Sequence, residues 1–225
     1  MRHLKSIILG IFAGIAISFG GLVNLVCKSL GHPLVGNILF SVGLLIVCSF
    51  GLYLFTGKIG YVFHNKLDYV IDLGEMYIGN LIGATGIGYI ARLCTKETSD
   101  LFAVAEQVSN SKILGPDGSS WYKILLYGIL CGILVYLAVD AFKNEKFHPV
   151  LRVFILVFCV STFVVAGFEH CIANMFYFAF GNAYGVNFGM TVVSILLCTL
   201  GNTIGAIVLN EGIRFAKSPN KEKTE

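Results

Sequence analysis

The stretch that decides the fold of this chain is Ala166-Gly167-Phe168-Glu169-His170-Cys171-Ile172-Ala173-Asn174-Met175. Two ionisable residues stand side by side in apolar sequence, and no charged residue follows until Glu211. Residues 171–210 are too many for one membrane helix and too few for two helices with a loop. We therefore expect a half-helix that re-enters the membrane, then a full span, with Gly181, Asn182 and Gly185 as break points. The alternative is that Glu169 and His170 mark an ordinary extramembrane helix end.

The composition agrees with a membrane protein. Of the 225 residues, 56% are hydrophobic and 13% are charged, whereas soluble domains carry about 25% charged residues. The net charge is only +3, and the basic residues lie in short loops and tails, which argues against nucleic-acid binding. The five His are scattered and no two Cys are spaced as CxxC, so we expect neither a metal site nor a cofactor.

Six segments are apolar enough to cross a membrane or nearly so. The third is short and must borrow flanking residues 69–73, and the sixth follows the half-helix. The first five run from about Ile7 to Val26, Leu34 to Phe55, Met76 to Ala91, Ile124 to Val139, and Leu151 to Phe168. We expect a single all-α domain over 1–225, with a tail from about 214 to 225.

Positive charge predicts the orientation of these spans. With six spans both termini share one side, and that side carries 11 of the 16 Lys and Arg residues, so both termini are predicted to be cytoplasmic. The 11 are Arg2, Lys5, Lys58, Lys66, Lys143, Lys146, Arg152, Arg214, Lys217, Lys221 and Lys223. The longest connection, from about Cys94 to Trp121, then lies outside.

Two pairs of glycine-rich segments indicate an internal repeat. Residues 10–15 (GIFAGI) resemble 128–133 (GILCGI), and residues 79–84 (GNLIGA) resemble 201–206 (GNTIGA), at separations of 118 and 122. Halves of about 1–110 and 111–215 then hold three spans each, so the second half enters from the opposite side. Inverted repeats of this kind place a pathway between the halves.

Polar residues at the predicted helix breaks are candidates for structural and pore roles. Leu54-Phe55-Thr56-Gly57-Lys58 suits either an unwound segment that lines a cavity or an ordinary helix end. Asn80 and Asn202 carry amides that need partners within the membrane, such as the ends of broken helices. Glu169 and Asn174 are expected to brace backbone. His170 is the better pore candidate, because its charge can change near physiological pH.

Several motifs together resemble the formate/nitrite transporter family over nearly the whole chain. Within the family, a chain this short is similar to the hydrosulfide-channel branch. The motifs are Phe55-Thr56-Gly57, residues 79–84, residues 128–131, Gly167-Phe168-Glu169-His170 with Ile172-Ala173-Asn174-Met175, and residues 201–205. The resemblance implies an aquaporin-like fold of six helices with broken second and fifth helices. It also implies a homopentamer with one pore per protomer.

The resemblance also implies roles for particular residues. His170 corresponds to a central His between two hydrophobic constrictions, Phe163 and Phe55 to slit aromatics, and Ile59 to an aliphatic gate. Thr56, in the same segment, is also expected to line the pore. The external basic residue of the family is best matched by Lys112, with Lys123 as the alternative.

Two departures from the family's pattern stand out. Gly132 replaces a usual Asn, which predicts a wider or less polar vestibule. The connection after Thr56 is short, and this leaves the usual Thr or Ser partner of the central His unassigned.

The predicted function is a channel, not an enzyme, in the cell membrane. It would conduct small monovalent anions of weak acids, with hydrosulfide favoured and formate or nitrite as alternatives. A pore for a neutral solute such as water or glycerol is a second possibility. A membrane redox enzyme that uses His170 and Cys171 is a third, disfavoured because paired His ligands and a nucleotide-binding loop are missing.

Overall fold

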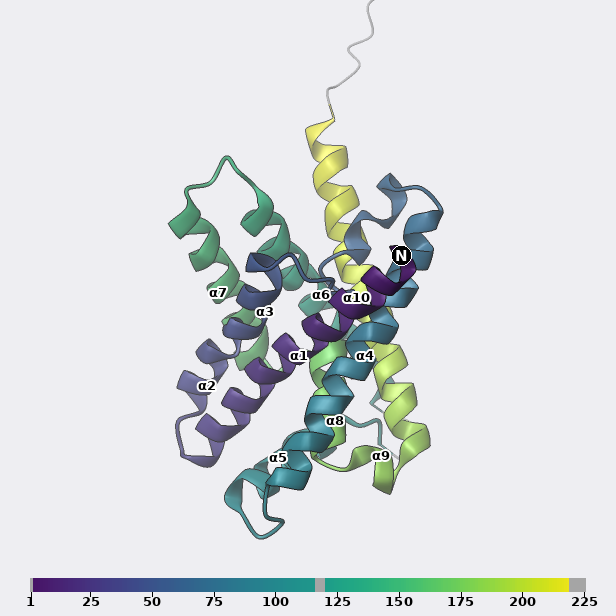
Figure 1. The fold of residues 1–225 in the computed structure, drawn as a ribbon. Coiled ribbons are helices and arrows are strands. Elements are labelled where there is room, and N and C mark those ends of the chain that lie inside the picture. Colours follow the sequence, from purple (N-terminus) through teal and green to yellow (C-terminus); the bar gives the residue numbers. More distant parts are fainter. Residues whose placement is uncertain (1, 116–119, 219–225) are drawn as a thin grey trace, which may run out of the picture.

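A computed structural model describes residues 2–115 and 120–218, and within these ranges the chain is helical and contains no strand (Figure 1). The elements are α1 (Arg2–Ser29), α2 (Pro33–Leu39), α3 (Ser41–Ser49), η1 (Ile59–His64), α4 (Asp68–Cys94), α5 (Asp100–Lys112), α6 (Trp121–Lys143), α7 (Pro149–Val165), α8 (Cys171–Phe180), α9 (Ala183–Val186) and α10 (Phe188–Lys217).

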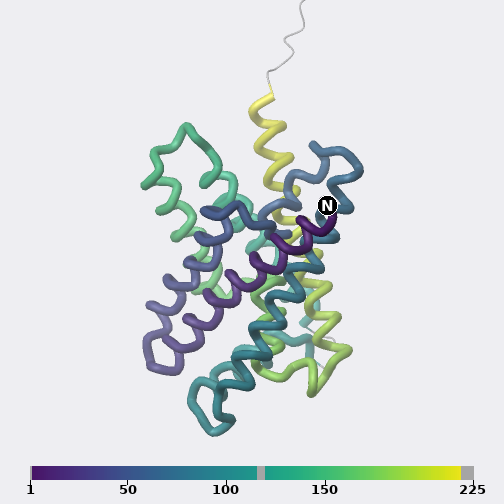
Figure 2. Tube along the Cα trace, viewed as in Figure 1, coloured from purple at the N-terminus to yellow at the C-terminus, as the bar shows by residue number. Residues whose placement is uncertain are grey.

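The helices join two opposite faces of the molecule. The N-terminal face carries the start of α1, η1 and the end of α10, and the α5 face carries α5 and α9 (Figures 1 and 2). In the described part of the chain, three helices are long and apolar enough to cross a membrane, namely α1, α6 and α10. The remaining predicted spans contain more polar or shorter helices.

Close backbone contacts hold α1 against α4 and α6 against α10. A Cβ atom on Gly83 of α4 would collide with the carbonyl oxygen of Ile11 in α1, and one on Gly205 of α10 would collide with that of Ile129 in α6. These two contacts are related by shifts of 122 and 118 positions, the separations found in the sequence. Glycine is required at both places because the two backbones approach too closely for any side chain.

The amides of Asn80 and Asn202 make equivalent hydrogen bonds in the two halves. Asn80 accepts from the Phe55 amide at 2.9 Å and donates to the carbonyls of Gly10 and Tyr53 at 2.8 Å each. Asn202 accepts from the Cys171 amide at 2.9 Å and donates to the carbonyls of Gly128 and Glu169 at 2.8 and 2.7 Å. Each fully buried amide therefore fixes a non-helical segment to two helices.

Two irregular segments interrupt the helices where the chain passes the middle of the molecule. The first follows α3 and the second lies between α7 and α8; a glycine with positive φ begins each turn, Gly51 at 63° and Gly167 at 70°. The helix of the second predicted span ends at Ser49, earlier than the expected Phe55, because Phe50 and Gly51 form a turn and extended backbone follows.

Other helix boundaries differ from the expectations in detail. The half-helix after His170 is α8, and it stops at Gly181, where Asn182 takes a left-handed φ of 62°. Gly185 does not break the chain, because it lies inside α9. The long connection contains α5, which is amphipathic rather than apolar and was not expected. The tail was predicted to begin at about residue 214, but α10 continues to Lys217. Residues 219–225 of that tail lie outside the described residues.

Candidate functional site

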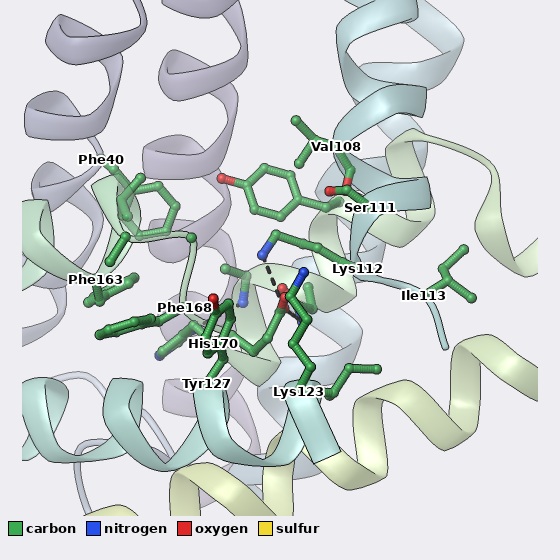
Figure 3. Close-up of a pocket in the computed structure, with 18 of the residues that line it drawn as sticks. Phe40, Val108, Ser111, Lys112, Ile113, Lys123, Tyr127, Phe163, Phe168 and His170 are labelled. Atoms are coloured by element: carbon green, nitrogen blue, oxygen red, sulfur yellow. Dashed lines mark hydrogen bonds and ion pairs between the residues drawn. The ribbon is translucent and has the colours of Figure 1, made fainter. Parts of the chain in front are cut away.

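A cavity of about 520 Å³ opens near the α5 face and reaches the second irregular segment (Figure 3). Its walls come from the ends of α5 and α6, from α7 and from residues 166–170. Three cations, Lys28, Lys112 and Lys123, and one carboxylate, Glu169, line it. We call this space the outer cavity.

His170 lies at the inner end of the outer cavity and is only 3% exposed. Its Nε2 is 2.9 Å from the Oγ1 of Thr56, a buried residue on the first irregular segment. Its Nδ1 accepts a hydrogen bond from the Ala173 amide at 3.2 Å, so the ring caps α8. The hydrogen bond between His170 and Thr56 thus joins the two irregular segments.

The two hydrogen bonds of His170 define its neutral form. An Nδ1 that accepts from the Ala173 amide carries no proton, so Nε2 carries it and donates to Thr56 Oγ1. The Thr56 hydroxyl then has its own proton free for another acceptor. This arrangement can offer a hydrogen-bond donor to a solute that passes between His170 and Thr56.

Buried aromatic rings lie on both sides of this pair. The ring of Phe163 is stacked on His170, with centroids 5.8 Å apart and planes at 14°. Phe40 meets Phe163 edge-on at 5.8 Å. On the first irregular segment Phe55 packs edge-on against Tyr77 at 5.0 Å, and Ile59 is buried at the start of η1. Phe40 was not singled out from the sequence, since it looked like any other residue of an apolar span.

Glu169 pairs with side chains rather than with backbone. Its Oε2 accepts from Lys112 Nζ at 3.0 Å and from Asn174 Nδ2 at 2.7 Å. Lys123 also points into the outer cavity, and its Nζ lies 5.7 Å from the ring centroid of Tyr127 (Figure 3). The third cation of the cavity, Lys28, was missed because it seemed to be an ordinary basic residue at a helix end.

Gly132 does not widen this vestibule. A Cβ atom there would collide with the backbone of Asn202, so Gly132 faces α10, which fills the space beside it. The position is equivalent to Gly14, which meets the backbone of Asn80 in the same way. The expectation of a wider vestibule is wrong because this residue points away from the cavity.

Comparisons with known proteins show which proteins this chain resembles. A model of the formate/nitrite transporter family matches residues 1–216. The nitrite transporter NirC of Escherichia coli (strain K12) is 29% identical over 201 residues, which cover 82% of this chain and 72% of the relative. A probable formate transporter of Methanothermobacter thermautotrophicus is 30% identical, with 91% and 85% covered.

Solved structures share the fold. A pentameric formate channel with formate bound superposes with a TM-score of 0.78 at 24% identity, covering 95% of this chain and 96% of that one. An ion channel of the same family superposes with a TM-score of 0.74 at 23% identity. The relatives are transporters and channels rather than enzymes, which removes the redox alternative. The chain is an integral membrane protein and belongs to the formate/nitrite transporter family.

Proposed function

We propose that this chain forms a homopentameric channel for small monovalent anions of weak acids, with one pore in each protomer. The observation that carries the proposal is His170, buried between aromatic rings at the end of a lysine-lined cavity and hydrogen-bonded to Thr56 across the two irregular segments. A pentamer is supported by the structural neighbour named as a pentameric formate channel.

The proposed architecture is six membrane spans in an inverted repeat of three and three. The matching glycine contacts and the matching hydrogen bonds of Asn80 and Asn202 support it. The helices of the first half start at the face where the corresponding helices of the second half end (Figure 1). The protein then lies in the cell membrane with the N-terminal face, and both termini, toward the cytoplasm, as the excess of positive charge on that side favours.

The lysines of the outer cavity attract the anion, and the anion loses its water where it passes the aromatic rings. Lysines around the cavity raise the local anion concentration, and Lys112 is the best placed, although Glu169 compensates part of its charge. Lys123, without that carboxylate contact, shares this role. Beyond them lie Phe163, Phe55 and Ile59, where a bare anion loses solvation.

The His170–Thr56 pair offsets part of the desolvation cost. The free proton of the Thr56 hydroxyl donates a hydrogen bond to the anion. Alternatively, His170 first takes up a proton, and the resulting imidazolium transfers it to the anion, so that the neutral acid crosses the apolar part of the pore and neutral His170 remains. Formate, nitrite and hydrosulfide all suit this chemistry, because each is monovalent, small and the base of a weak acid. Hydrosulfide is our favoured substrate, because it has a single heavy atom and the rings of Phe40, Phe163 and His170 pack against one another.

Anion flux tests the proposal. Purified protein in liposomes should carry formate, nitrite or hydrosulfide, and His170→Phe should abolish the dependence of that flux on pH while the pentamer remains assembled. Phe154→Leu, which changes an exposed aromatic on α7 away from the pore, serves as the control and should leave the flux unchanged. Flux of water or glycerol without anion current would favour the neutral-solute pore and overturn the proposal.

A further inference from the structure

A second, smaller cavity of about 80 Å³ lies on the N-terminal face, beside the first irregular segment. Leu54, Gly57 and Lys58 of that segment line it, together with Cys48 of α3 and Lys143 in the last turn of α6. We call this space the inner cavity. Its volume is between two and three times the share of one water molecule in the liquid, about 30 Å³, which suits a small ion.

The inner cavity is the counterpart of the outer cavity. Seven of its nine lining residues, shifted by 116 positions, become lining residues of the outer cavity. The same shift of 116 positions relates Phe55, whose amide bonds to Asn80, to Cys171, whose amide bonds to Asn202. Leu54 takes the place of His170 and Lys58 takes the place of Asn174. Since the proposed function has the outer cavity take up the anion, the equivalent space of the first half is a candidate binding site.

The two cavities differ in charge. In the outer cavity Asn174 bonds to Glu169, five residues earlier, and Lys112 is neutralised by the same carboxylate. The inner equivalent of Glu169 is Tyr53, and the ammonium group of Lys58 lies 4.2 Å from the centroid of its ring. An aromatic ring holds a cation in place without cancelling its charge.

Lys143 also lies against an aromatic ring. Its Nζ lies 5.0 Å from the centroid of the Tyr61 ring, and the nearby carboxylate of Asp140 accepts a hydrogen bond from the Tyr61 hydroxyl at 3.1 Å. Across residues 2–115 and 120–218, neither Lys58 nor Lys143 forms an ion pair. Two cations that form no ion pair among the described residues therefore share a cavity that is large enough for a small anion.

We propose that the inner cavity is an anion-binding site, in which Lys58 and Lys143 hold a small monovalent anion at the inner mouth of the pore. The proposal rests on the proposed function for the identity of the anion. The site loads or releases the anion next to Phe55 and Thr56, where the apolar part of the pore begins.

Cys48 provides a direct test, because its thiol lines the inner cavity and is partly accessible. Iodoacetate is a small monovalent carboxylate, and iodoacetamide is its neutral analogue. Both reagents alkylate the thiolate of the intact purified protein, and mass spectrometry of its peptides gives the rate at each cysteine. The ratio of the two rates at Cys48 does not depend on the thiolate fraction, so it reports the local attraction of anions. Exposed Cys94 on the α5 face is the internal reference.

Lys58→Met and Lys143→Met should each lower the iodoacetate-to-iodoacetamide ratio at Cys48 about fivefold, and formate should slow labelling by iodoacetate in the unmodified protein. Lys58→Arg should keep the ratio, and so should Lys146→Met, which removes a charge from the same face outside the cavity. The ratio at Cys94 should not change. A ratio at Cys48 that stays within twofold in both Met variants, or a Cys48 that neither reagent modifies, overturns the proposal.

This measurement does not depend on conduction. If the unmodified protein carries no anion but the ratio responds to Lys58 and Lys143, the proposed function fails and the inner site stands. If the protein conducts and the ratio does not respond, the inner site fails alone. In conducting protein, the Met variants should also raise the half-saturating formate concentration on the N-terminal face about fivefold, with no change on the α5 face.

Discussion

Thr56 and His170 stand 114 positions apart in the chain, and their side chains meet at 2.9 Å between Oγ1 and Nε2. Each is almost fully buried, and each belongs to a segment that lies between helices. The contact therefore depends on both irregular segments being in place at once.

Replacing Thr56 tests this contact. Thr56→Val keeps the shape but leaves the Nε2 proton of His170 without an acceptor, at a cost of about 1–3 kcal/mol. We expect anion flux to fall about tenfold and thermal stability in detergent to fall by a few degrees. Thr56→Ser keeps the hydroxyl and should retain most of both. Equal flux in the Val and Ser variants would contradict a role for the hydroxyl.

The glycine contacts make a second prediction. Gly83→Ala and Gly205→Ala each place a methyl group against the backbone of the facing helix, so overpacking should destabilise the protein by about 1–3 kcal/mol or more. Gly86→Ala and Gly212→Ala, on the same two helices, have open space around the added Cβ. These controls should be neutral or slightly stabilising, because alanine favours the helix.

Thermal unfolding in detergent measures these four variants. The prediction is that the first pair unfolds at a clearly lower temperature than the unmodified protein, whereas the second pair does not. A drop of the same size in all four would mean that the methyl group acts through the helix itself and not through the contact between helices.

The ion pair between Lys112 and Glu169 in the outer cavity makes a third prediction. Lys112→Met leaves the carboxylate of Glu169 buried with only Asn174 as a partner, and loss of one member of a buried pair costs about 3–5 kcal/mol. Lys112→Met with Glu169→Gln removes both charges and should recover much of that stability. Lys123→Met, at an exposed position, is the control and should change unfolding little. A double variant as unstable as Lys112→Met alone would argue against direct coupling.

The buried amide of Asn202 makes a fourth prediction. Asn202→Leu removes three hydrogen bonds between its side chain and the backbone, and it leaves the carbonyl of Glu169 and the amide of Cys171 unpaired. We expect loss of the assembled protein, or a stability loss larger than that of any single-bond variant above. Asn65→Ala, which removes one exposed hydrogen bond, is the control. Size-exclusion chromatography of both variants decides the outcome, and a normal profile for Asn202→Leu would refute the structural role.

The sequence predicted the helical membrane fold, the family and the break after His170, because these depend on local signals: long apolar runs, a rare charged pair inside them and short specific motifs. The pairing of Thr56 with His170 was not predicted, since it depends on how two distant segments approach each other. For the same reason the direction of Gly132 was misjudged. A motif places a residue along the chain, but only packing decides which neighbour it faces.

The amphipathic helix α5 was also missed. Its residues Asp100–Lys112 lack the continuous apolar run by which the spans were found, and one face of the helix packs on α8 and α1. Helices that lie over other helices at a membrane surface are difficult to find by hydropathy, because half of each turn is polar.

The close backbone contacts limit how this molecule can move. No side chain separates α1 from α4 at Gly83, or α6 from α10 at Gly205. Within each pair, one helix cannot slide along the other without a clash of backbone atoms, so the two pairs form stiff frames. In the channel that we propose, opening and closing then falls to the segments these frames support, residues 50–58 and 166–170. Such a gate needs only small rotations about Gly51 and Gly167, because glycine adopts their left-handed backbone torsions without strain.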